Sequence, residues 1–327
     1  MIAELKEKCD LLVQNKRILQ DAFKWEAGLM SLTAATLYTD SGMLADAEQL
    51  KRCETIMKEK TSIFSEFRGN AKMPLLCKMA LSDDPAQYFA NVEKLYGLLN
   101  KSKWLGDEYK IMAAITLCDH EDESAYEAAV DRTNEIYARM KQEHKWLTSN
   151  EDIPFAAILA VSNLDIDRLI FEMERNYRIL KDTFHNSNAV QSLSHILALD
   201  ERIADEKCAR VTALFNELKA IKHRFGASYE LATLGTLTLL DLPGKEIAAL
   251  IAEVDDYLKG QKGFGSLALN ANERRLFAAQ LVLKQYGPKP NPGDSAVLGS
   301  VLALTVATEI SMTLCITCCI SASATTH

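Results

Sequence analysis

The sequence predicts an all-α protein built from helical pairs that repeat about every 40 residues, in a solenoid-like or closed helical array. Three observations support this fold class. An aromatic residue recurs at a nearly constant spacing, nearly apolar stretches alternate with amphipathic ones, and no stretch shows the sustained alternation of a strand. In such an array each pair buries its apolar surface mainly against its neighbours.

The recurring aromatic residue lies near the end of each amphipathic stretch. The stretches read "EKLYGLL", "NEIYARM", "ERNYRIL", "TALFNEL" and "VDDYLKG", and their aromatic residues are Tyr96, Tyr137, Tyr177, Phe215 and Tyr257. In the first four, a leucine or methionine follows three places on and therefore shares a helical face with the aromatic residue. We expect Tyr96, Tyr137, Tyr177 and Phe215 to occupy equivalent buried positions.

The first helix of each pair is nearly apolar on all sides. These helices read "MPLLCKMAL", "KIMAAITLC", "PFAAILAV", "VQSLSHILAL" and "ELATLGTLTLL". Such helices are expected to be buried between neighbours, whereas the amphipathic second helices are expected to lie outside. We expect helices to start at Asp84 with Pro85, at Pro154, at Pro243 and at Asp165 in the "NLDIDRL" stretch.

The N-terminal stretch "LLVQNKRILQDAFKWEAGLMSLTAATLYT", the helix "EYKIMAAITLC" and the repeated apolar helices resemble a bacterial family catalogued as domain of unknown function 4003. The resemblance covers about residues 1–287. The resemblance implies an all-helical fold, but it implies no activity and identifies no catalytic residue.

Composition limits the possible partners. The 327 residues include 45 acidic and 37 basic side chains, for a net charge of -8, which opposes nucleic-acid binding. The first 16 residues interleave charged and apolar side chains and do not form a secretory signal, so we expect a cytoplasmic protein. Five scattered cysteines upstream of the C-terminal region are typical of buried side chains in a reducing compartment.

No motif in the helical region predicts catalysis, and we expect neither an enzyme nor a cofactor. In "CDHEDES", Cys118 and His120 are weak candidates for a metal site, because acidic residues at a helix start are favoured by the helix dipole without any metal. His195 lies within an apolar helix and is expected to be a buried histidine with a hydrogen bond. His144 and His185 are expected at the surface.

The composition divides the chain into three parts. Residues 1–287 form the predicted helical-repeat domain, and residues 288–294 form a spacer with three of the chain's seven prolines. Residues 295–327 form a tail rich in apolar residues, serine, threonine and cysteine. Within the tail, residues 296–320 contain Glu309 as the sole charged residue.

Three interpretations of the tail remain open. About 20 apolar residues can span a bilayer, so residues 296–320 could anchor the protein in a membrane, although Glu309 disfavours this. The tail could instead cap the open end of the helical array. It could also be the core of a post-translationally modified peptide, with the helical domain as leader. The candidate modification residues are Ser311, Thr313, Cys315, Thr317, Cys318 and Cys319.

The tail cysteines also allow a weak metal site. Cys315, Cys318 and Cys319 offer three thiolates without an evident fourth ligand. The sequence therefore predicts a non-enzymatic carrier or binding scaffold that presents its tail to a protein or peptide partner, with a tail-modifying enzyme as one such partner. The alternatives are a tail-anchored helical scaffold and a tail that acts only as a cap.

Overall fold

The computed structural model describes residues 1–327 except 25–27, 102–106, 163, 229, 267 and 288–327. Its described residues form α-helices and short 3₁₀ helices and contain no strand, so the all-α prediction is confirmed. The α-helices are α1 (Ala3–Ala22), α2 (Gly28–Asp40), α3 (Ala47–Lys60), α4 (Lys72–Leu81), α5 (Pro85–Asn100), α6 (Glu108–His120), α7 (Tyr126–Glu143), α8 (Ile153–Val161), α9 (Ile166–Leu180), α10 (Ser187–Leu197), α11 (Ala204–Ala220), α12 (Glu230–Leu237), α13 (Gly244–Lys259) and α14 (Ala271–Tyr286).

The described chain divides into two compact units. The first unit comprises residues 1–9, 139–148 and 162–287, and the second comprises residues 10–138 and 149–161. Each unit is therefore assembled from segments that are separate in the sequence.

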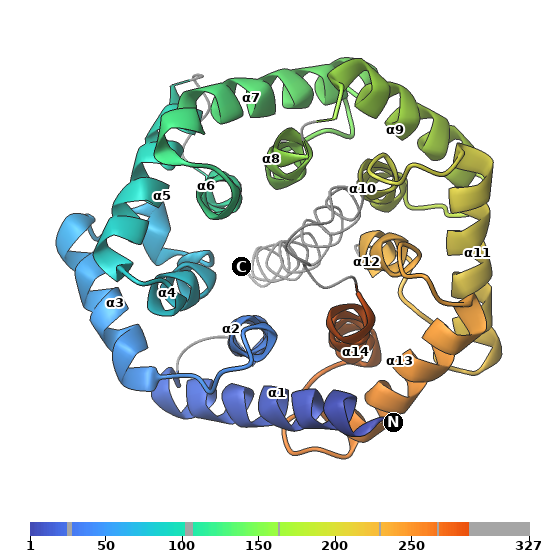
Figure 1. The fold of residues 1–327 in the computed structure, drawn as a ribbon, viewed down its shortest axis with the longest axis horizontal. Coiled ribbons are helices and arrows are strands. Elements are labelled where there is room, and N and C mark those ends of the chain that lie inside the picture. The colour runs from blue at the N-terminus through green and yellow to red at the C-terminus, as the bar shows by residue number, and fades with distance from the viewer. Residues whose placement is uncertain (25–27, 102–106, 163, 229, 267, 288–327) are drawn as a thin grey trace, which may run out of the picture. The chain divides into compact units, whose positions relative to one another are not determined.

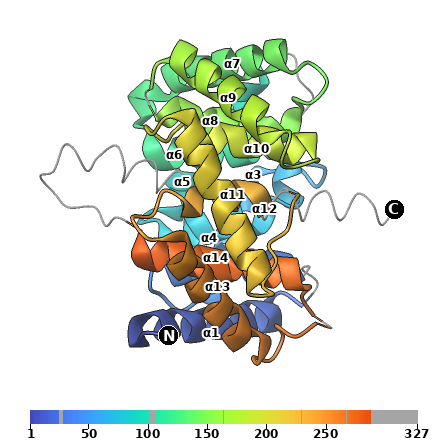
Figure 2. The same ribbon diagram turned by 90° about the vertical axis from the view of Figure 1, so that its right-hand side faces the viewer.

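Each unit has a layer of apolar helices packed on amphipathic ones. In the first unit, α12 packs between α10 and α14, and these pack on the amphipathic helices α9, α11 and α13 (Figures 1 and 2). In the second unit, α2 packs on α4 and α6 packs on α8, while α3 and α5 provide the amphipathic side. We call α2, α4, α6, α8, α10, α12 and α14 the buried-layer helices.

Burial distinguishes the two kinds of helix. In α9 the buried residues Leu169, Ile170, Met173 and Leu180 recur every three or four positions, so one face is covered. In α8 all nine residues are buried, and in α12 all eight are. This agrees with the expectation from the apolar sequences of the first helices.

Local sequence signals place the helix starts as expected. Asp84 caps α5 by accepting hydrogen bonds from the backbone N–H groups of Ala86 and Gln87, both at 3.0 Å, and Pro85 opens the helix. Asp165 caps α9 in the same way, with its side chain accepting from the N–H of Arg168. These contacts satisfy backbone donors that a helix leaves unpaired at its first turn.

The recurring aromatic residues are less buried than expected. Tyr137 is 6% exposed, whereas Tyr96, Tyr177 and Phe215 are half-buried. Three of these rings contact a ring from a connection earlier in the chain. The pairs are Phe67 with Tyr96 at 5.0 Å between ring centroids, His144 with Tyr177 at 4.5 Å, and Phe184 with Phe215 at 5.1 Å. A similar ring contact thus recurs along the chain, while the solenoid-like or closed arrangement stays a prediction.

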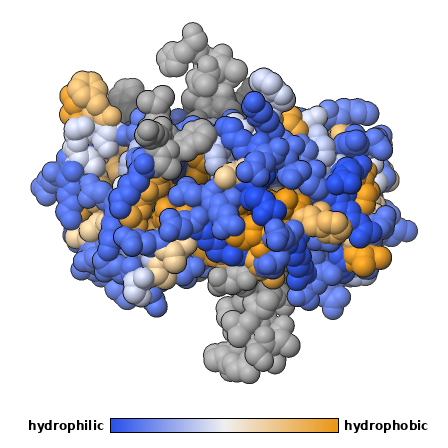
Figure 3. All heavy atoms as spheres, turned by 90° about the horizontal axis from the view of Figure 1, so that it is seen from above, coloured by the Kyte–Doolittle hydropathy of each residue, from blue (hydrophilic) through white to orange (hydrophobic). Residues whose placement is uncertain are grey.

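Figure 3 shows a face on which hydrophilic residues predominate, with apolar groups between them. Within the described part of the chain, no helix combines the length and the apolar character that crossing a membrane requires.

Candidate functional site

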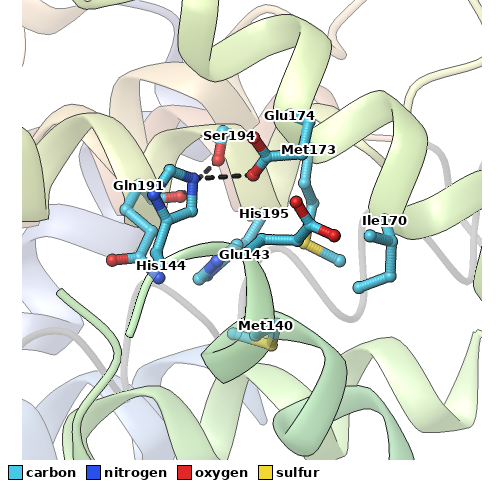
Figure 4. A pocket seen from close by; sticks show the side chains of 9 residues that line it. All are labelled: Met140, Glu143, His144, Ile170, Met173, Glu174, Gln191, Ser194 and His195. Carbon is cyan, nitrogen blue, oxygen red and sulfur yellow. Dashed lines mark hydrogen bonds and ion pairs between the residues drawn. The ribbon is translucent and has the colours of Figure 1, made fainter. Parts of the chain in front are cut away.

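A small hollow lined by apolar and polar side chains lies in the first unit, where the end of α7 meets α9 and α10 (Figure 4). It has room for about one water molecule. The side chains that line it belong to Met140, Glu143, His144, Ile170, Met173, Glu174, Gln191, Ser194 and His195.

The closest charged contact in the hollow joins His144 and Glu174. His144 Nε2 lies 2.6 Å from Glu174 Oε1, and Figure 4 shows the two side chains turned toward each other. The distance is that of an ion pair, although the carboxylate oxygen lies outside the direction that a hydrogen bond requires. His144 is only 18% exposed, so the expectation of a surface histidine was wrong.

His195 is the most deeply buried titratable group of the hollow, at 2% exposed. Burial is the main reason that the pKa of His195 is lowered to about 3, and the neighbouring His144 contributes to this shift. The imidazole is therefore neutral near pH 7. A neutral histidine in a space for one water molecule is consistent with the structural role that the sequence predicts.

We expect His195 to make the protein less stable in mild acid. The unfolded chain binds this proton near pH 6.5 and the folded chain near pH 3, so stability is full above pH 6.5 and is lost as the pH falls toward 3. The loss is on the order of 1 kcal/mol per pH unit. Urea unfolding at pH 7.5, 5.5 and 4.5 measures it.

The matched comparison uses two histidine variants. His195→Gln should show a shallower loss of stability between pH 6.5 and 4.5, whereas His185→Gln, at an exposed position, should follow the wild-type curve. The groups that share the hollow with His195 are His144, Glu143 and Glu174, and they are the same in both variants. Parallel curves for all three proteins would contradict the assignment.

The connection between α7 and α8 is held at both ends beside this hollow. At one end, His144 contacts Glu174 and the ring of Tyr177. At the other end, Gln191 Nε2 donates to Thr148 Oγ1 at 2.8 Å, and Thr148 Oγ1 donates to the carbonyl of Met140 at 3.2 Å. We call residues 144–148 the anchored loop.

Trp146 lies at the middle of the anchored loop and is 91% exposed. Lys145 Nζ lies 5.7 Å from the centroid of its ring. Because Thr148 is 4% exposed and His144 is 18% exposed, the ends of the loop are fixed while the indole stands in solvent. Sequence analysis did not single out Trp146, since neither its spacing nor its neighbours form a motif.

Within the part of the chain that the structure describes, the weak metal candidates Cys118 and His120 do not belong to a cluster of metal-ligating side chains. Burial raises the pKa of the Cys118 thiol to about 11, and Tyr126 OH lies 3.8 Å from its sulfur. A protonated thiol is a poor metal ligand. The tail residues Ser311, Thr313, Cys315, Thr317, Cys318 and Cys319 lie outside the described residues.

Among the described residues, one group of side chains has donor atoms close enough for a metal ion, namely His223, Asp255 and Asp256. Asp255 already contacts two guanidinium groups: Arg274 Nε lies 2.6 Å from Oδ1, and Arg275 Nε lies 3.1 Å from Oδ2. Two adjacent positive charges oppose the binding of a cation. The arrangement is that of a buried ion-pair network, which the sequence analysis did not find.

Comparisons with known proteins extend the family resemblance. The model of a family described as "Protein of unknown function (DUF4003)" matches residues 16–318. No curated protein and no solved structure matches the chain. The match continues past residue 287, where the resemblance was expected to end, and includes the spacer and most of residues 296–320.

Proposed function

The chain belongs to the family described as Protein of unknown function (DUF4003), and we propose that it is a non-enzymatic helical scaffold that binds another protein through the anchored loop. The observation that carries this proposal is the exposed indole of Trp146 on a loop whose two ends are fixed.

The geometry of the anchored loop favours protein recognition. Tryptophan is enriched among the residues that dominate binding energy at protein interfaces. A side chain presented by an already ordered loop loses less conformational freedom on binding than one on a disordered segment. The net charge of -8 opposes both nucleic acid and anionic lipid surfaces as partners.

The role of the tail is a separate part of the proposal. The family match continues to residue 318, which supports a tail that belongs to the helical protein rather than cargo attached to it. Tail modification and membrane anchoring stay predictions, because residues 288–327 lie outside the described residues.

Replacing Trp146 with glutamine is expected to weaken partner binding about 30-fold, corresponding to about 2 kcal/mol at a central aromatic contact. The free energy of unfolding should change by less than about 0.5 kcal/mol, because the indole is 91% exposed. The partner is first identified in the native host by photo-cross-linking from a photoreactive residue at position 146 of the full chain. The affinity of the identified partner for the wild-type protein and for Trp146→Gln is then measured by calorimetry.

The control places the same photoreactive residue at the exposed position 219 on α11. We expect a discrete protein adduct from position 146 and none from position 219. Equal adducts from both positions, or undiminished binding by Trp146→Gln, would refute the anchored loop as the binding surface.

A further inference from the structure

The solvent side of α9 carries arginine and phenylalanine over most of its length. The buried residues Leu169 and Met173 mark the covered side of this helix, and Phe171 lies two positions from each of them, about 200° around the axis. Phe171 therefore points away from the core, and it is 62% exposed. The exposed residues of α9 between positions 168 and 178 are Arg168, Phe171, Arg175 and Arg178. We call these four residues the arginine face.

The arginine face is one continuous stripe along the helix. Its spacings of three, four and three positions return to the same side of an α-helix, and ten positions rise about 15 Å. The stripe contains no acidic residue, although the chain as a whole has 45 acidic and 37 basic residues. A single exposed phenylalanine is common on protein surfaces, whereas arginine and aromatic residues are both enriched at protein interfaces. The composition of the arginine face is therefore that of a binding surface.

The positive charge of the arginine face is available to a partner. Arg175 Nη2 lies 2.8 Å from Asp205 Oδ2, but the two side chains are 44% and 69% exposed, and such a pair is weak in water. Neither Arg168 nor Arg178 forms an ion pair with another described residue. A guanidinium group has five N–H donors and can bind a carboxylate through two parallel hydrogen bonds.

Ion pairs on both flanks hold α9 in place beneath the arginine face. On one flank, Lys207 Nζ of α11 lies 2.5 Å from Glu172 Oε2, and Figure 2 shows α9 beside α11. On the other flank, His144 Nε2 of the anchored loop lies 2.6 Å from Glu174 Oε1. Both glutamates are only 17% exposed, so they present little negative charge to a partner. The arginine face thus borders the loop that carries Trp146.

The two ends of the arginine face favour a short acidic partner segment. The exposed Asp165 precedes the face, and the exposed Asp182 follows it. A nucleic-acid backbone or an anionic membrane extends beyond the roughly 15 Å of the stripe and would meet these carboxylates, which repel it. A short segment of a protein fits between them. Its carboxylates can pair with the arginines while an apolar side chain covers Phe171.

We propose that the arginine face binds a short acidic segment of a protein partner, with at least one apolar side chain of that segment packed on Phe171. The carboxylates of the segment pair with Arg168 and Arg178, which lie on either side of Phe171 along the helix. The partner is the one that the anchored loop binds, so this assignment of its chemistry rests on the proposed function.

Photo-cross-linking from position 171 of the full chain in the native host tests this assignment. The photoreactive residue is a phenylalanine derivative, which keeps the ring, and the cross-linked peptide is identified by mass spectrometry. We expect a protein segment with more acidic than basic residues, from the same partner that position 146 captures. The control position is the exposed Ala249 on α13, which should give no such adduct. A nucleic-acid or lipid adduct, a neutral or basic segment, or no adduct at position 171 would overturn the proposal.

Charge reversal tests the role of the arginines in the affinity for that partner. Arg168→Glu combined with Arg178→Glu should weaken binding at least about ten-fold, because both positions then repel the acidic segment. The milder Arg168→Gln with Arg178→Gln should weaken it about three-fold. The matched control, Lys245→Glu with Lys259→Glu, makes the same change in net charge at exposed positions of α13 and should leave the affinity within about two-fold. Thermal unfolding shows that each variant is folded.

The affinities of the variants distinguish failure of this proposal from failure of the proposed function. If Trp146→Gln weakens binding and the arginine reversal does not, the anchored loop stands as the binding surface and the acidic segment is overturned. If the arginine reversal weakens binding and Trp146→Gln does not, the proposed function fails, and with it the surface shared by the anchored loop and the arginine face.

Discussion

Replacing Asp255 with alanine is expected to lower the free energy of unfolding by about 3 to 5 kcal/mol. Asp255 is 1% exposed and accepts from Arg274 Nε at 2.6 Å and from Arg275 Nε at 3.1 Å, with His223 Nδ1 at 3.0 Å. Arg274 is itself only 3% exposed, so removal of the carboxylate leaves a guanidinium charge buried without its counter-charge. Urea unfolding at pH 7 measures the loss.

The neighbouring Asp256 provides the control for this experiment. Its side chain is 65% exposed, and its Oδ2 lies 3.5 Å from His223 Nε2. Asp256→Ala is therefore expected to change the free energy of unfolding by less than about 1 kcal/mol. Similar losses for the two variants would show that burial of the Arg274 charge does not dominate the network.

Replacing Glu172 with glutamine is expected to lower the free energy of unfolding by about 3 kcal/mol, through a different buried charge. Lys207 is 0% exposed, and its Nζ donates to Glu172 Oε2 at 2.5 Å and to the carbonyl of Asp200 at 3.1 Å. Without the carboxylate, the ammonium group is left with neutral acceptors, namely the glutamine amide oxygen and the carbonyl of Asp200, and loses the opposite charge of Glu172. Urea unfolding of the variant measures the effect.

The opposite replacement should be less harmful. Lys207→Met keeps a similar volume in the core, and Glu172, at 17% exposed, can still be hydrated. We expect a loss below about 1.5 kcal/mol, and the double variant should resemble Lys207→Met, since the buried charge is then absent. A larger loss for Lys207→Met than for Glu172→Gln would contradict this asymmetry.

The sequence alone determined the helices and their division into apolar and amphipathic kinds. The starts at Asp84 and Asp165 follow from side-chain caps within three residues of the backbone groups that they satisfy. The burial of all of α8 and the single buried face of α9 follow from the periodicity of apolar residues over two to four turns. The caps are interactions within one helix, and the apolar pattern that marks the faces to be covered is contained in a single segment, so spacing along the chain specifies both.

The sequence did not determine how deeply the recurring aromatic residues are buried, because this depends on the tertiary structure. Their spacing correctly placed Tyr96, Tyr177 and Phe215 near the ends of amphipathic helices. The rings are half-buried because each sits at the edge of its helix's covered face, beside a ring from an earlier connection. A contact between residues about 30 positions apart leaves no periodic signal in either segment.

Only the tertiary structure decided which polar side chains meet. His144, in the anchored loop after α7, and Glu174, in α9, are 30 positions apart, and Asp255 meets Arg274 across the connection between α13 and α14. In the sequence, a single histidine or aspartate that folding will bury looks the same as one that will stay in solvent. The exposure of Trp146 is of the same kind, because it results from the fixing of His144 and Thr148 by α9 and α10, and burial is a property of the packed chain rather than of its residue types.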